Sequence, residues 1–127
     1  MKFHKIEGSK PSSGHYTPAV SANGFLFISG QVPVDPITGE KYSGGIEEQF
    51  MGILNNLKRL LEDSGSNLDN VVKVNIYVPD AENWGIVNEI YSKFFGKHKP
   101  ARAIIPCGKL HKWYLLELEA IAILKDN

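Results

Sequence analysis

One helical pattern constrains the fold of this chain more than any other feature. Between Ile46 and Leu61, apolar residues recur at spacings of three and four, which places them on one side of a helix. Glu47 and Glu48 fall in its first turn, where carboxylates suit the positive end of the helix dipole, and Gly65 is suited to end it. A helix with one apolar face must pack on another element, so the pattern predicts a layered fold. The apolar side consists of Ile46, Phe50, Ile53, Leu54, Leu57, Leu60 and Leu61.

Alternating apolar residues predict strands on both sides of this helix. Before it, Ala19–Ala22 and Phe25–Ser29 flank the pair Asn23-Gly24, and this arrangement is typical of a tight hairpin because both turn residues tolerate positive φ. The stretch 31–45 that follows is rich in Gly and Pro, so we expect a loop. After the helix, Val71–Val78 alternates. One face of that strand is expected to carry Val72, Val74, Ile76 and Val78.

A second helix and two more strands complete the predicted order. Asp80 can cap a helix from about Ala81 to Gly96. We expect strands over 101–106 and 115–124, the latter with its two glutamates on one face. The order hairpin, helix, strand, helix, strand, strand predicts a single α+β domain over residues 1–127, with two helices packed on one face of a mixed sheet. The apolar stripe of the second helix is Trp84, Val87, Tyr91, Phe94 and Phe95.

Two helices can cover only one face of such a sheet. The strands at Phe25–Ile28 and Leu115–Leu124 nevertheless carry apolar residues toward both faces. A large apolar surface in water is an association surface. We therefore expect neighbouring subunits to cover the second face.

Composition excludes several classes of function. Lys and Arg together number 14 and so do Asp and Glu, which gives a formal net charge of 0 and argues against a protein that coats nucleic acid or an anionic membrane. The only cysteine, Cys107, excludes an internal disulfide. The start of the chain lacks the apolar core of a signal peptide, and no apolar run is long enough to span a membrane, so we expect a cytoplasmic protein.

Common catalytic patterns are missing from the sequence. The four histidines lie far apart without metal-ligand spacing, so we expect no built-in metal site. The sequence also lacks the nucleophile elbow of serine hydrolases and the phosphate-binding loop of nucleotidases.

An arginine and a glutamate on apolar strands are the candidates for chemistry. Burying Arg102 costs desolvation unless it meets an anion. One interpretation, favoured from the residues alone, is an ion pair with Glu117 or Glu119. The other is a receptor in which the guanidinium binds a substrate carboxylate through two hydrogen bonds. Partial burial could likewise raise the pKa of Glu117 and let it orient or protonate a water.

Several segments in order resemble the RidA/YjgF family of enamine/imine deaminases. The resemblance extends from about Gly14 to Ala122, nearly the whole chain. It rests on Gly14-His15-Tyr16, Phe27–Gln31 with Pro33, Asp35–Gly39, Gln49 with Asn55-Asn56-Leu57, Val87-Asn88 with Tyr91 and Phe94-Phe95, Pro100–Arg102 and Glu117–Ala122.

The resemblance implies a chorismate-mutase-like α+β subunit that assembles as a homotrimer with ligand clefts between subunits. It implies hydrolysis of 2-aminoacrylate-type enamines and their imines to 2-keto acids and ammonia, as metabolite detoxification without a cofactor. By the same resemblance Arg102 grips the substrate carboxylate and Glu117 positions the attacking water. Other positions that line or support the cleft are Tyr16, Ser29, Gly30 and Asn88.

One departure from the family pattern bears on substrate choice. Family deaminases often carry cysteine two residues after the arginine, whereas Ile104 occupies that position here and Cys107 is out of register. We expect Ile104 to alter the side-chain preference without abolishing hydrolysis. Two alternatives stay open: a non-catalytic module that binds small keto or amino acids, and RNA cleavage, which the zero net charge disfavours.

Overall fold

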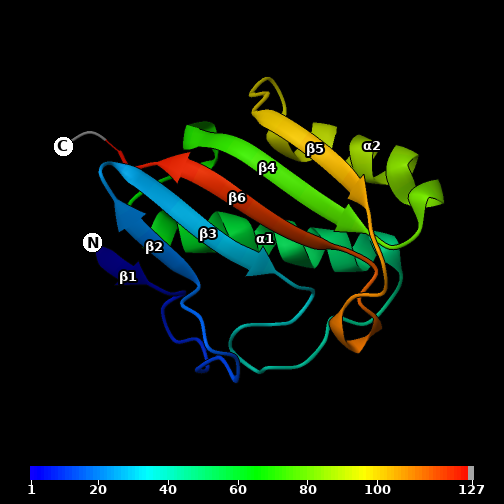
Figure 1. Ribbon diagram of the computed structural model, residues 1–127, viewed down its shortest axis with the longest axis horizontal. Helices are drawn as coiled ribbons and strands as arrows, with labels where there is room; N and C mark the ends of the chain where they lie inside the picture. The colour runs from blue at the N-terminus through cyan, green and yellow to red at the C-terminus, as the bar shows by residue number, and fades with distance from the viewer. Residues whose placement is uncertain (126–127) are drawn as a thin grey trace.

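The computed structural model describes residues 1–125 and forms two layers, a sheet and a pair of helices (Figure 1). The sheet has six strands in the order β1-β2-β3-β6-β4-β5. All neighbours are antiparallel except β4 and β5, which run parallel, so the sheet is mixed as predicted. The strands are β1 (Lys2–His4), β2 (Ala19–Ala22), β3 (Phe25–Gln31), β4 (Val71–Val78), β5 (Ala101–Pro106) and β6 (Glu117–Ile123).

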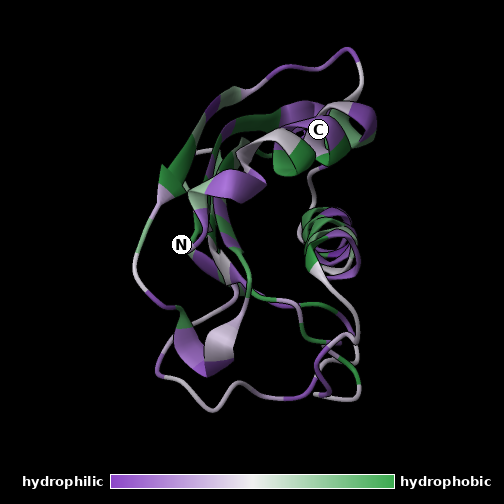
Figure 2. Cartoon of the chain, turned by 90° about the vertical axis from the view of Figure 1, so that its right-hand side faces the viewer, coloured by the Kyte–Doolittle hydropathy of each residue, from purple (hydrophilic) through white to green (hydrophobic). Residues whose placement is uncertain are grey.

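The two predicted helices are present, and both pack on the same face of the sheet. They are α1 (Ile46–Asp63) and α2 (Trp84–Phe95), which Figure 2 shows on one side of the strands. The core between the layers is built from the apolar stripe of α1, from Val87, Tyr91 and Phe95 of α2, and from alternate residues of the strands. Burying a Val, Leu, Ile or Phe side chain in this core stabilises the folded state by roughly 1.5–3 kcal/mol. None of the helices within residues 1–125 is long and apolar enough to cross a membrane.

The structure adjusts several predicted boundaries. The hairpin turn is confirmed, with φ of 52° at Asn23 and 82° at Gly24. Asp80 caps a separate short 3-10 helix, Ala81–Asn83, so α2 begins only at Trp84. Two further 3-10 turns, Leu68–Asn70 and His111–Trp113, precede β4 and β6. Strand β1 was not predicted, because three residues are too few to show a period.

A bulge at the start of β4 corrects one predicted face. Val71 pairs with Ala122 and Lys73 with Ile121, so two residues of β4 oppose one of β6. As a result Val71 is buried in the core and Val72 is 44% exposed, the reverse of the simple alternation. From Val74 onward the alternation holds.

The face of the sheet opposite the helices is uncovered and carries several large apolar side chains. Phe25, Phe27 and Ile123 belong to it, each more than 40% exposed. Phe27 and Phe25 pair across strands with Ile121 and Ile123. We call this surface the open face and the other the helix face.

Candidate functional site

The predicted site residues fall into two groups in the structure, and the first group surrounds Arg102. Arg102 Nη1 donates a hydrogen bond to Asn88 Oδ1 on α2 at 2.9 Å. Its guanidinium also lies 4.9 Å from the centre of the Tyr91 ring and 5.8 Å from that of Trp84. Asn88 therefore orients the arginine and leaves most of its N–H donors free for an anion.

The predicted ion pair between Arg102 and a glutamate of β6 is wrong. Within residues 1–125 the salt bridge that forms joins Lys93 and Glu89, one turn apart on α2. Glu117 and Glu119 lie on the opposite face of the sheet from Arg102. The arginine thus stays half-buried among aromatic rings with an amide, not a carboxylate, as its partner.

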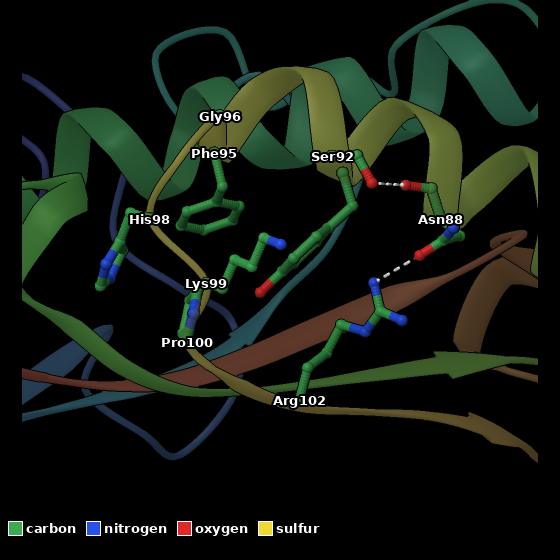
Figure 3. A pocket seen from close by; sticks show the side chains of 9 residues that line it. Asn88, Ser92, Phe95, Gly96, His98, Lys99, Pro100 and Arg102 are labelled. Atoms are coloured by element: carbon green, nitrogen blue, oxygen red, sulfur yellow. Dashed lines mark hydrogen bonds between the residues drawn. The ribbon is translucent and has the colours of Figure 1, made fainter.

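A pocket of about 410 Å³ opens beside Arg102, between α2 and the chain that leads into β5. Figure 3 shows Arg102 and Asn88 at one end of this pocket, and Lys99, Pro100 and His98 toward the other. His98 shares a hydrogen bond with the backbone oxygen of Val71 at 2.7 Å, which ties the loop to β4. The lining residues are Asn88, Tyr91, Ser92, Phe95, Gly96, His98, Lys99, Pro100 and Arg102.

The second group centres on Glu117, which projects from β6 onto the open face. Burial and the neighbouring Glu119 carboxylate raise the pKa of Glu117, and His111 opposes them with a smaller effect that lowers it. Gly30 on β3 lies directly against this side chain, and a Cβ on Gly30 would overlap Glu117 Oε2. Glycine at position 30 is therefore required for Glu117 to occupy its present position.

Glu119 lies two residues along β6 on the same face and has its own partner. The Tyr77 hydroxyl donates a short hydrogen bond to Glu119 Oε2. That bond and burial raise the pKa of Tyr77. Tyr77 thus holds Glu119, while Glu117 has no hydrogen-bond partner among the described side chains.

Ser29 and Tyr16 border this second group. Ser29 Oγ donates to the backbone oxygen of Thr17 at 2.6 Å, so its hydroxyl hydrogen is already used within the chain. Tyr16 is 55% exposed, and its ring packs on Gly14, where a Cβ would lie 2.7 Å from a ring carbon. Burial raises the pKa of Tyr114, and Tyr16 and Glu117 raise it further, so these three side chains lie near one another.

The two groups lie on opposite faces of the sheet because of the pleat. Arg102 pairs with Val74, whose side chain is buried under the helices, whereas Glu117 pairs with Tyr77 on the open face. Successive side chains along a strand alternate between faces. One chain therefore does not bring Arg102 and Glu117 together.

Ile104 on β5 and Cys107 just after it also lie on different sides of the sheet. Ile104 pairs with the buried Ile76, so it lies on the helix face with Arg102. Cys107 donates its backbone N–H to Val78 O; burial raises the pKa of its thiol, and the Glu117 carboxylate raises it further. The thiol thus belongs with Glu117 and cannot replace the cysteine that the family often has at position 104.

Tyr91 and Lys99 are among the pocket residues to which the sequence analysis gives no role in the site. Tyr91 was assigned to the apolar stripe of α2, and Lys99 was given no role. The signal that could have found Tyr91 is its spacing, since a residue three after Asn88 lies on the same side of a helix. No group of three metal-binding side chains occurs within residues 1–125.

Comparison with known proteins identifies the family of this fold and site. Residues 7–124 match the family model named Endoribonuclease L-PSP. A RutC family protein of Pyrococcus abyssi is 43% identical over 109 residues, which cover 86% of each chain. The human 2-iminobutanoate/2-iminopropanoate deaminase is 37% identical over 110 residues, covering 87% of this chain and 80% of the human one.

A solved structure agrees with the sequence matches. E. coli TdcF with bound serine superposes with a TM-score of 0.89 at 29% identity, covering 98% of this chain and all of that one. The names in the family differ in the activity they state, so membership alone leaves the reaction open. The match over nearly the whole chain shows that this protein belongs to the Endoribonuclease L-PSP family, also called the RidA/YjgF family.

Proposed function

We propose that this protein hydrolyses 2-imino acids and their enamine tautomers to 2-keto acids and ammonia, in clefts between the subunits of a homotrimer. The observation that carries the proposal is Arg102, held by Asn88 at the rim of a pocket and without a carboxylate partner among residues 1–125. A planar guanidinium with free donors is suited to a carboxylate. The human relative named as an imine deaminase supports the same class of substrate.

The reaction needs little more than positioning. Water adds to the C=N carbon of the imine, and the carbinolamine then expels ammonia and leaves a keto group. Arg102 would fix the carboxylate next to that carbon, and Glu117 would orient the water and move its proton. A raised pKa brings a carboxyl group closer to the pH at which it can both accept and return a proton.

The positions of the two groups support the assembly of several subunits that the proposal requires. Arg102 and Glu117 project from opposite faces of one sheet, so a cleft that contains both must be formed by residues of different chains. The open face, with Phe25 and Phe27 exposed, offers an apolar surface for such an interface. A ring of subunits gives every cleft one arginine and one glutamate.

The decisive experiment measures keto-acid release from 2-iminopropionate generated in solution. We expect the wild-type protein to accelerate release, and Arg102→Ala to lower kcat/KM by about 100-fold or more while the trimer persists. Lys97→Ala is the control, because this exposed lysine is not among the residues that line the pocket. A folded wild-type protein that gives no acceleration would refute the proposal.

A non-catalytic binding module is the second candidate. The serine bound to the E. coli relative favours it, since that relative holds a small amino acid intact in the crystal. Such a module would bind a keto acid without producing one, so the same assay separates the two functions. RNA cleavage, which the family name mentions, has less support because the net charge is 0.

A further inference from the structure

The pocket beside Arg102 contains a polar group that its own chain leaves unsatisfied. Tyr91 on α2 is only 5% exposed, and its hydroxyl has no hydrogen-bond partner in the part of the chain that the structure describes. Burial raises the pKa of this phenol to about 12, so it remains a donor at neutral pH. Buried hydroxyls are normally hydrogen-bonded. An unpaired one in a pocket wall therefore indicates a ligand atom that accepts a hydrogen bond.

The charges around this hydroxyl are all of one sign. Of the nine lining residues, Arg102 and Lys99 are cations and none is an acid. Lys99 forms no salt bridge within residues 1–125. Asn88 accepts from Arg102 through its oxygen, which leaves its NH2 group as a further donor. The pocket thus offers donors and positive charge.

The two cations line different ends of the pocket, so they are suited to two separate anionic groups on one ligand. Two residues, Pro100 and Ala101, separate Lys99 from Arg102 along the chain, which limits the distance between their Cα atoms to about 11 Å. Arg102 is fixed at one end by Asn88, whereas Lys99 approaches from the other end of the pocket (Figure 3). A single carboxylate on Arg102 would leave Lys99, at the other end, without an anionic partner.

We propose that the preferred substrates are dicarboxylic, that is, 2-imino acids with an acidic side chain. Arg102 binds the carboxylate next to the imine, as the proposed function requires, and the side-chain carboxylate is bound by Lys99 and the Tyr91 hydroxyl. A site that hydrogen-bonds a substrate group discriminates strongly against an analogue without it, because its own polar groups are then left unpaired. The inference thus assigns the substrate's side chain to a part of the pocket for which the family match gives no role.

The binding of stable keto acids tests the inference without relying on turnover. Titration calorimetry compares 2-oxoglutarate with 2-oxopentanoate, which has the same chain length but no second carboxylate. We expect the dianion to bind about tenfold more tightly. Lys99→Met and Tyr91→Phe should each remove most of this difference, while the affinity for 2-oxopentanoate stays within about twofold.

The control is Lys97→Met, which removes a neighbouring exposed cation that does not line the pocket. It should leave the preference for 2-oxoglutarate intact. Equal affinity of the wild-type protein for both acids would overturn the inference. So would a preference that Lys97→Met abolishes as fully as Lys99→Met, because the charge of the whole region would then be responsible.

Turnover separates this inference from the proposed function. If the wild-type protein binds 2-oxoglutarate selectively but hydrolyses no imine, the dianion site stands and the deaminase proposal fails. If it hydrolyses the imines of glutamate and norvaline equally well, deamination stands and the inference fails. We expect kcat/KM to favour the imine of glutamate by about tenfold, and Lys99→Met to abolish that preference.

Discussion

The two halves of the predicted site differ in surroundings, although β5, which carries Arg102, and β6, which carries Glu117, belong to one sheet and are separated only by β4. Arg102 lies on the helix face at the end of the strand order, where α2 supplies Asn88 and the wall of a pocket. Glu117 lies on the open face between β3 and β4, with Gly30 against it and no helix above. The first half is a pocket within one chain, whereas the second is a carboxyl group of raised pKa on a surface. Under the proposed function each half lacks what the other provides, and a second copy of the chain would supply it.

Mixing two inactive variants tests this division most strongly. Arg102→Ala and Glu117→Gln chains, each expected below about 1% of wild-type activity, are unfolded and refolded together in equal amounts. In a ring of shared clefts, about a quarter of the clefts regain both native residues, so about a quarter of the activity should return. The measurement is keto-acid release from 2-iminopropionate.

The matched mixture combines Arg102→Ala with a double variant that carries both substitutions. No cleft can then hold a native arginine, and activity should stay absent. If the first mixture also stays inactive while trimers form, the shared cleft is disproved, and Arg102 and Glu117 act within one chain or not at all.

Gly30→Ala should damage the Glu117 half without touching the pocket. The added Cβ would overlap the Glu117 carboxylate and displace it. A misplacement of about 1 Å can cost about 100-fold in rate, so we expect kcat to fall by that order while keto-acid affinity changes little. Gly108→Ala is the control, because a Cβ there meets nothing within 4 Å. Unchanged kcat in Gly30→Ala would show that the position of Glu117 does not matter.

The variant Phe27→Lys tests whether the open face is the interface between subunits. Phe27 is 45% exposed on the open face, so a lysine there should leave the fold intact but weaken self-association by about 30-fold or more. Met51→Lys places the same charge on α1 at a residue that is 39% exposed, and there the trimer should persist. Sedimentation at micromolar concentration measures both. If Phe27→Lys remains a trimer as stable as wild type, the open face is not the interface.

Local patterns predicted most of the fold, because an element that is buried on one side has apolar residues at regular spacings in the sequence. The α1 stripe and the Asn23-Gly24 hairpin were found in this way. The bulge that exchanges Val71 and Val72 was not, because it depends on how β4 pairs with β6 rather than on β4 alone. Strand order likewise depends on contacts between distant segments.

The site was predicted less completely, for a related reason. Alternation along each strand gives the face of a residue only relative to its own strand, so it could not show that Arg102 and Glu117 point apart. Their separation depends on the pairing of Arg102 with Val74 and of Glu117 with Tyr77. The family resemblance named Arg102, Glu117 and Asn88 as site positions but did not say which of them are in contact, so the hydrogen bond from Arg102 to Asn88 was not predicted.

The smallest expected effect is a shift in the acid limb of the pH–rate profile, and it tests only the role of Glu117. If ionised Glu117 activates the water, kcat/KM falls as the pH drops through its pKa, which burial and the Glu119 charge raise. Glu119→Gln removes that negative charge, so ionised Glu117 becomes easier to form, its pKa falls, and the limb should move to lower pH. Glu89→Gln, at an exposed acid paired with Lys93 on α2, should not move it.

A limb that stays in place in Glu119→Gln, or moves to higher pH, would mean that the profile reports another group. The catalytic role of the open-face half would then lose its main electrostatic support, while the pocket beside Arg102 would be unaffected, because it contains no acid and lies on the other face of the sheet.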